Sequence, residues 1–160
     1  MISAAAPHNS RRITAGALTF ILLAGIISIV PLYGNQLDSP GALGKTRSMA
    51  ETQHEIVMLL IKQKEYQKAV VEANRIFEMK WPEDQEPLLL KELLFLSDQF
   101  LKKGQALLGM QVIEKSSRCF KSPSSQIAIW KEKGYLYKNM NQDDRAIDCF
   151  RKARELENKD

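Results

Sequence analysis

The last 34 residues, 127–160, carry a pattern that predicts two helices packed closely against each other. Small and large apolar residues alternate there at helical spacing. Gly134 lies between two large aromatic residues of the expected first helix, and a glycine has no side chain to keep a second helix away. Alanines at matching positions of the second helix complete the contact. The residues expected in this contact are Trp130, Gly134, Tyr137, Ala146, Phe150 and Ala153.

Polar residues mark the ends of these two helices. Asn141 stands where the turn needs a residue that tolerates a left-handed backbone, and the side chain of Asp143 can cap the second helix. Upstream, Ser124 or Ser125 can cap the first helix. The segment therefore predicts a complete helical hairpin.

Together these offsets resemble one complete tetratricopeptide repeat (TPR), a repeated hairpin of two helices. Lys133 and Asn158 depart from the family pattern, which usually has an apolar residue and a proline at these places. The resemblance implies an all-α scaffold that binds proteins. Because a single repeat cannot bury its own apolar face, about three repeats are expected to stack together.

Two earlier stretches predict further hairpins of the same kind. Apolar residues recur at helical spacing through both stretches, and the proline-containing segment 81–87 separates them. Ser48 and Glu51 have the spacing of a capping box, so the first helix is expected to begin near Met49. As the resemblance implies, we expect a short right-handed solenoid of three TPR-like hairpins, with repeats at about 50–83, 90–123 and 127–160.

A long uncharged segment lies near the N-terminus. No charged residue occurs between Arg12 and Asp38, and residues 13–33 are almost entirely apolar. A helix of that length rises roughly 30 Å, which is the thickness of the hydrocarbon core of a bilayer. A cleaved secretory signal is the alternative, but its apolar core is usually about 7–15 residues long and ends in a small-x-small site. We therefore expect an uncleaved transmembrane helix at 13–33.

The charges that flank this span predict its orientation. Arg11 and Arg12 precede it, whereas no cation follows it closely. By the positive-inside rule the tail, 1–12, stays in the cytoplasm, and the C-terminal domain is exported. In a bacterium this makes a single-pass inner-membrane protein with a periplasmic domain. The segment 34–47, rich in glycine and small polar residues, is expected to be a flexible linker to a TPR-like domain at 48–160.

The resemblance implies that a partner protein or peptide binds the exposed faces of the first helix of each hairpin. These faces mix apolar and basic side chains, which suits an extended or helical peptide with some acidic character. For each side chain the alternative is ordinary solvated or packing surface. The expected groove residues are His54, Met58, Ile61, Leu94, Asp98, Leu101, Lys131, Tyr135 and Lys138.

No motif in the sequence predicts an enzyme, a metal site or a cofactor site. Cys-x-x-Cys, His-Glu-x-x-His, Gly-x-Ser-x-Gly and glycine-rich phosphate-loop patterns do not occur. The net charge of +4 is too small to indicate nucleic-acid binding, and no small-molecule substrate is expected. Cys119 and Cys149 are expected to be free thiols, because their places on the second helices of successive hairpins differ by roughly 10 Å in height.

The sequence thus predicts a membrane-tethered scaffold or adaptor that binds its partner through a TPR groove. The alternative is a structural subunit of a membrane-bound secretion, envelope or maturation complex. In that case the span or the convex face of the solenoid makes the contacts with the other subunits, and the groove binds no partner.

Overall fold

The structure, a computed structural model, describes residues 40–159. This part of the chain is all-α, as predicted, and has no β-strand. Two short 3-10 helices, η2 (Glu83–Gln85) and η3 (Ser117–Cys119), accompany six α-helices. These are α1 (Pro40–Lys62), α2 (Tyr66–Glu78), α3 (Glu86–Lys102), α4 (Ala106–Ser116), α5 (Pro123–Asn139) and α6 (Asp143–Glu157).

The predicted cytoplasmic tail at 1–12 and the predicted transmembrane helix at 13–33 lie outside the described residues, as does the first part of the predicted linker. Among the helices of residues 40–159, none combines the length and the hydropathy of a bilayer span.

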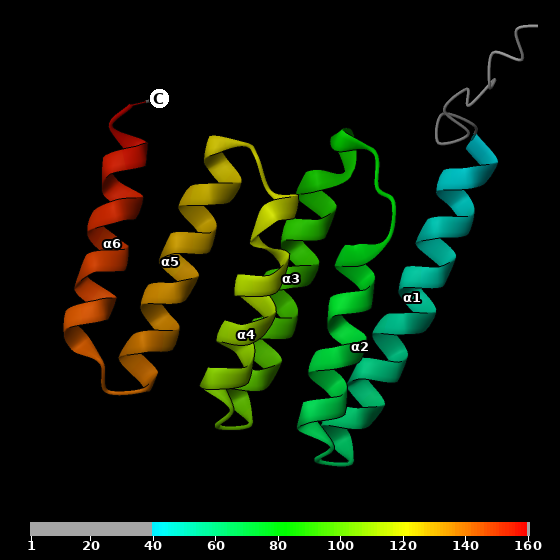
Figure 1. Cartoon of the computed structure of the whole chain (residues 1–160), viewed down its shortest axis with the longest axis horizontal. Coiled ribbons are helices and arrows are strands. Elements are labelled where there is room, and N and C mark those ends of the chain that lie inside the picture. Colours follow the sequence, from blue (N-terminus) through cyan, green and yellow to red (C-terminus); the bar gives the residue numbers. More distant parts are fainter. Residues whose placement is uncertain (1–39, 160) are drawn as a thin grey trace, which may run out of the picture. The chain divides into compact units, whose positions relative to one another are not determined.

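The six helices form three antiparallel hairpins, α1 with α2, α3 with α4 and α5 with α6, which lie side by side (Figure 1). Between the hairpins, α2 packs on α4, and α5 packs on both α3 and α4. The tight turns within the hairpins all lie at one end of the array, and the longer links between hairpins lie at the other. We call these the turn end and the link end.

The three tight turns share one backbone geometry. Each contains one residue with a left-handed backbone, namely Lys64 (φ 62°), Gly104 (φ 71°) and Asn141 (φ 56°). The next residue donates its backbone N–H to the carbonyl five residues earlier, from Glu65 to Leu60, from Gln105 to Phe100 and from Gln142 to Tyr137, each at 2.9 Å. This bond closes a helix that ends in a left-handed residue. The backbone conformation predicted for Asn141 is therefore confirmed.

The two links between hairpins are fastened to each other at the link end. Glu86, in the first turn of α3, accepts hydrogen bonds from the backbone N–H groups of Lys121 and Ser122, both at 3.0 Å, and from the Ser122 hydroxyl at 2.5 Å. The side chains of Lys121 and Glu83 form an ion pair at 3.0 Å. These contacts join the link before α3 to the link before α5.

The hydrophobic core lies between the hairpins and is centred on α3. Leu93, Leu96 and Phe100 of this helix are completely buried. So are Val57 of α1, Val112 and Ile113 of α4, and Leu136 of α5. Burial of one such side chain contributes about 1.5–3 kcal/mol, so these contacts are the main forces that hold the hairpins together.

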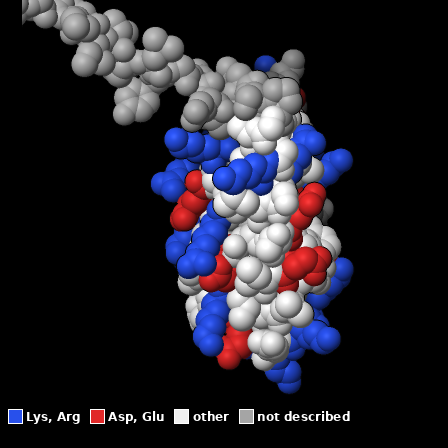
Figure 2. Space-filling model, turned by 90° about the vertical axis from the view of Figure 1, so that its right-hand side faces the viewer, with Lys and Arg blue, Asp and Glu red and all other residues white. Residues whose placement is uncertain are grey.

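Several large apolar side chains remain exposed. α1 exposes Met49, Ile56 and Leu59, while α2, α4 and α6 expose one such residue each, Val71, Leu107 and Ile147. Figure 2, which views the molecule from the α1 side, shows an uncharged strip running lengthwise between side chains of both charge signs. Met49, Ile56 and Leu59 follow one another at intervals of seven and three residues, so they share a face of α1, and apolar side chains gathered on one exposed face are typical of interaction sites.

The start of α1 differs from the prediction. The helix begins at Pro40, so the residues from 40 to 47 of the predicted linker are helical, and the expected start near Met49 was wrong. Ser48 and Glu51 lie inside the helix and do not form a capping box. Proline is well tolerated at a first helical position, and the Arg47 side chain donates a hydrogen bond to the Gln85 side chain at 2.5 Å, which holds this end of α1 in place.

Two other predicted caps are also corrected. The N-cap of α5 is Ser122, whose hydroxyl accepts a hydrogen bond from the Ser125 backbone N–H at 3.3 Å, so the cap precedes the predicted serines. Asp143 is the first residue of α6, and the N-cap Gln142 makes no side-chain capping bond. In the first turn, the carboxylates of Asp143 and Asp144 instead interact favourably with the helix dipole.

Candidate functional site

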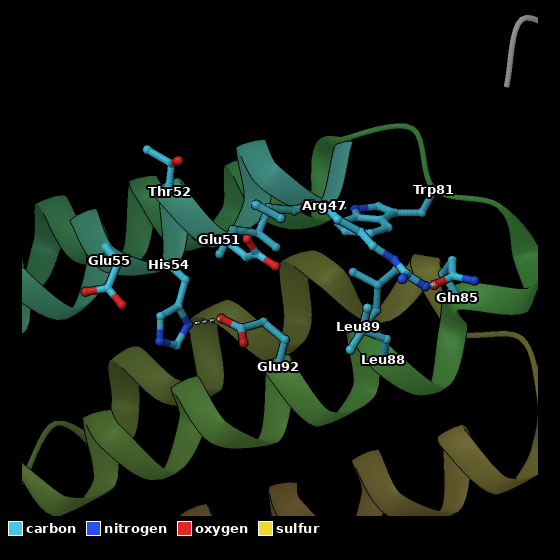
Figure 3. A pocket seen from close by; sticks show the side chains of 12 residues that line it. Arg47, Glu51, Thr52, His54, Glu55, Trp81, Gln85, Leu88, Leu89 and Glu92 are labelled. Carbon is cyan, nitrogen blue, oxygen red and sulfur yellow. Dashed lines mark hydrogen bonds and ion pairs between the residues drawn. The ribbon is translucent and has the colours of Figure 1, made fainter. Parts of the chain in front are cut away.

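A cleft of about 650 Å³ lies between α1 and α3, and we call it the first cleft (Figure 3). Its apolar lining consists of Ala50, Ile76, Trp81, Leu88 and Leu89. Its polar lining consists of Arg47, Glu51, Thr52, His54, Glu55, Gln85 and Glu92. The cleft therefore combines an apolar interior with charged groups around it, as binding sites usually do.

Two polar contacts cross the first cleft and set its width. His54 Nδ1 on α1 lies 2.7 Å from Glu92 Oε1 on α3, and the His54 ring lies 5.3 Å from the Phe95 ring. Toward the link end, Arg47 reaches across to Gln85 (Figure 3). These contacts join α1 to α3 through Glu92 and to η2 through Gln85, and the space of the first cleft lies between them.

Trp81 forms the wall of the first cleft at its link end. Its indole N–H donates a hydrogen bond to the Ile76 carbonyl at 2.8 Å, which fixes the ring against the end of α2. The residue is half-buried and packs against the core. An aromatic side chain held in this way offers a ligand a rigid apolar surface.

A second, shallower cleft of about 560 Å³ lies between α3 and α5 near the turn end, and we call it the second cleft. It is lined by Asp98, Leu101, Glu132, Tyr135, Lys138, Asn139 and Asn141. Ser97 donates a hydrogen bond from its hydroxyl to Glu132 Oε1 at 2.7 Å. Burial raises the pKa of Glu132, the Ser97 hydrogen bond opposes this rise, and the nearby Asp98 adds to it.

The structure brings five of the nine predicted groove residues to these two clefts. His54 lines the first cleft, and Asp98, Leu101, Tyr135 and Lys138 line the second. Met58 and Leu94 are half-buried and line neither cleft. Lys131 is also outside both, because its ammonium group pairs with Glu157 on α6 at 2.5 Å.

The prediction that Ile61 lines the groove was wrong. Its side chain is only 2% exposed and belongs to the core. It lies four residues after Val57, which is completely buried, and residues with this spacing share a helix face. That face of α1 points toward α2, so Ile61 stabilises the first hairpin and cannot contact a partner.

The sequence prediction missed most of the first cleft. Arg47 was assigned to a linker. Gln85 and Leu88 lie more than one turn before Leu94, the nearest predicted groove residue, and Glu92 lies two residues before it, on a different side of α3. One signal was available, since Trp81 is a tryptophan in a short link between helices, where a large aromatic residue usually has a packing role.

The predicted contact between the two helices of the last hairpin, α5 and α6, is close at Gly134. A Cβ atom on Gly134 would lie 2.7 Å from the Phe150 ring, so the ring of α6 packs directly on Gly134 and would have to shift to admit a side chain there. Ala146 and Ala153 of α6 are buried. Trp130, Tyr137 and Phe150 are half-buried, because no further hairpin covers this end in the described part of the chain.

The two cysteines are both unpaired. Burial raises the pKa of the Cys119 thiol and exceeds the opposing effect of Arg118. Burial also raises the pKa of the Cys149 thiol, where Lys133 opposes the rise and Asp148 adds to it. Neither thiol is therefore activated as a nucleophile. Residues 40–159 contain no group of three or more histidine, cysteine or acidic side chains placed to hold a metal ion.

No known family, curated protein or solved structure is significantly similar to this chain. The residues and geometry of the two clefts are therefore the guide to its function.

Proposed function

We propose that this chain is a membrane-tethered interaction scaffold, which binds a segment of a partner protein through the surface formed by α1, α3 and α5. The first cleft carries the proposal. Its volume of about 650 Å³ is within the range of roughly 300–1,000 Å³ that is typical of ligand sites, and its interior is apolar.

A TPR-like solenoid is part of the proposal. In support of it, the three turns have left-handed residues and closing hydrogen bonds at corresponding places. Their sequences differ, with lysine, glycine and asparagine at the left-handed position. Equivalent geometry from different residues is expected where a repeated unit has diverged while its packing requirements stayed the same.

An extended or helical peptide is a better ligand for this surface than a small molecule. Both clefts border α3 and follow one another across the odd-numbered helices, which run in the same direction (Figure 1). A peptide that places one side chain in each cleft would cross α3 and use both. We further propose that residues 13–33 anchor the scaffold in a bacterial inner membrane, with the described helices in the periplasm.

A second candidate is a structural subunit of a membrane-bound complex that uses the opposite face. The observation in its favour is that α2, α4 and α6 each expose a large apolar residue, with Val71 at 52%, Leu107 at 61% and Ile147 at 46% exposed. A partner that covered the even-numbered helices would bury all three.

Crosslinking in living cells, followed by affinity purification and mass spectrometry, distinguishes the two candidates. The matched variants are Leu88→Glu in the first cleft and Leu107→Glu on α4, since both leucines are exposed and both changes add one charge. Loss of a partner from Leu88→Glu and its retention by Leu107→Glu would support the scaffold. The reverse pattern would support the structural subunit and contradict the proposal.

The double variant Tyr135→Ala with Lys138→Ala extends the test to the second cleft. We expect it to weaken partner capture while leaving the helical circular dichroism signal unchanged, because both residues are exposed. Capture at the wild-type level would mean that the ligand uses only the first cleft.

A further inference from the structure

We infer that the first cleft selects a basic peptide segment. One large apolar side chain enters the cleft, and neighbouring lysine or arginine side chains contact Glu51 and Glu55. The inference rests on the proposed peptide-binding function and adds the shape and charge of the ligand to it.

The apolar part of the ligand follows from the walls of the cleft. Leu89 is 4% exposed and forms part of the core, whereas Leu88 beside it is 45% exposed and turns outward. Trp81 closes one end with a ring that its hydrogen bond to Ile76 holds in place. Transfer of an apolar side chain from water onto these surfaces is favourable in proportion to the area that it covers. A cleft of about 650 Å³ accommodates one or two side chains rather than a whole helix.

The charge of the ligand follows from which groups around the cleft are already paired. Glu92 contacts His54. Arg47 donates a hydrogen bond to the neutral Gln85 amide and keeps its charge, so three carboxylates of the lining face this one arginine. Glu51 and Glu55 are exposed, and neither forms an ion pair with any residue in the range 40–159. The rim therefore has two unpaired carboxylates.

The spacing of these carboxylates strengthens the case for a cationic ligand. Glu51 and Glu55 are four residues apart on α1, so they are neighbours on one face and repel each other. A lysine or arginine side chain beside either carboxylate would be attracted to it without breaking an existing ion pair. An acidic segment would instead add a third like charge.

The basic ligand inferred for the first cleft has the opposite charge to the acidic ligand that the lysines of the predicted groove led us to expect. Lys131 is already paired with Glu157, and Lys138 shares the second cleft with the carboxylates of Asp98 and Glu132. Neither lysine lines the first cleft. The charges at the cleft itself therefore decide the ligand that it accepts.

The test is selection from a random dodecapeptide library displayed on phage, with the full chain held in lipid nanodiscs as the target. We expect the recovered peptides to be richer in lysine and arginine than the starting library, with a large apolar residue next to the cations. The same selection is made against Glu51→Gln with Glu55→Gln. A matched control, Glu78→Gln with Glu114→Gln, makes the same change in net charge away from the cleft.

The enrichment of cations should disappear with the cleft variant and persist with the control. The best recovered peptide should bind the cleft variant about tenfold more weakly at low salt, with a smaller difference at high salt. The inference is overturned if no peptide is enriched, if acidic peptides are enriched, or if the cationic preference survives in the cleft variant.

Failure of this inference can be told apart from failure of the proposed function. If Leu88→Glu loses its partner in cells but the selection yields no cationic preference, the scaffold stands and the ligand chemistry is wrong. If Leu88→Glu keeps its partner in cells, the proposed function fails whatever the selection returns.

Discussion

The two interfaces between neighbouring hairpins, which we call seams, are built differently. In the seam between the second and third hairpins, α5 packs on both α3 and α4. Gly109 of α4 permits this, because a Cβ atom there would lie only 3.4 Å from Leu136 Cδ2 of α5, and 3.3 Å from the Ser97 carbonyl oxygen within its own hairpin. In the seam between the first and second hairpins, polar contacts bridge the first cleft between α1 and α3.

The difference shows that one hairpin unit can give either a packed joint or a binding surface. The outcome depends on residue size where the helices meet. In the second seam, Gly109 of α4 lets Leu136 of α5 come into close contact, and the shallow second cleft remains between α3 and α5. In the first seam, the longer side chains of His54 and Arg47 reach their partners without bringing the helices together.

Leucine truncation in each seam should give the largest effect. Leu136 is completely buried in the closed seam, so Leu136→Ala should lower the free energy of unfolding by about 3–5 kcal/mol. Leu89 borders an existing cleft, so Leu89→Ala leaves less new empty space and should cost about 2 kcal/mol. Chemical denaturation of both variants measures the difference. Equal losses would mean that the two seams are packed equally well.

Glycine substitution probes the close approach in the second seam. We expect Gly109→Val to lower the free energy of unfolding by about 1–3 kcal/mol, because the added carbons press against Ser97 and Leu136. Gly44 on α1 is a matched control, since a Cβ atom there has no neighbour within 4 Å. Gly44→Ala should raise the stability by about 0.5–1 kcal/mol, and thermal unfolding of the two variants should shift in opposite directions.

Low pH should weaken the hydrogen bonds of Glu86 that join the two links. Burial acts to raise the pKa of Glu86, but hydrogen bonds from Ser122, Ser125 and the backbone N–H groups of Lys121 and Ser122 lower it from 4.5 to about 2. A lowered carboxyl pKa contributes stability above pH 4.5, and this contribution is lost as the pH falls toward 2.

Screening by solvent reduces this contribution to on the order of 1–2 kcal/mol. Glu86→Gln should therefore lose stability at neutral pH and have a flatter dependence of unfolding free energy on pH between about 5 and 2. Denaturation curves at several pH values make the comparison. An unchanged slope in the variant would show that other carboxyl groups are responsible for acid sensitivity.

The buried carboxyl of the second cleft should give the smallest effect, with the opposite sign. Burial raises the pKa of Glu132, so the charged form is disfavoured in the folded state, and stability falls as the pH rises through the raised value. Glu132→Gln keeps an oxygen that can accept the Ser97 hydrogen bond. We expect a gain of less than about 1 kcal/mol at neutral pH, with no gain well below pH 4.5. A loss at neutral pH would contradict this assignment.

Local signals in the sequence predicted much of the fold. The left-handed turn at Asn141 and the glycine contact at Gly134 each follow from the conformational freedom or the small size of one residue. Each depends on residues that are close in sequence or on the opposite arm of the same hairpin. The helical periodicity of the chain likewise follows from neighbouring residues.

The first cleft could not be predicted in the same way, because it depends on distant pairs. His54 meets Glu92, and Arg47 meets Gln85, across 38 residues in each case. The start of α1 was missed because Pro40 and the following glycines resemble a linker, and because a capping-box pattern also occurs inside helices. Contacts with α3 and its preceding link decide both features, and no local pattern encodes them.

The common geometry of the tight turns has a consequence for protein engineering. The hydrogen bonds of the turns at Lys64 and Gly104 stay within their own hairpins, and a Cβ atom on Gly104 would meet nothing within 4 Å. Exposed turns of this kind accept inserted sequence readily. A fluorescent tag or an epitope grafted at the Lys64 turn, which lines neither cleft, would report on the scaffold without disturbing the ligand surface, whereas the same graft between Glu83 and Glu86 would separate the links.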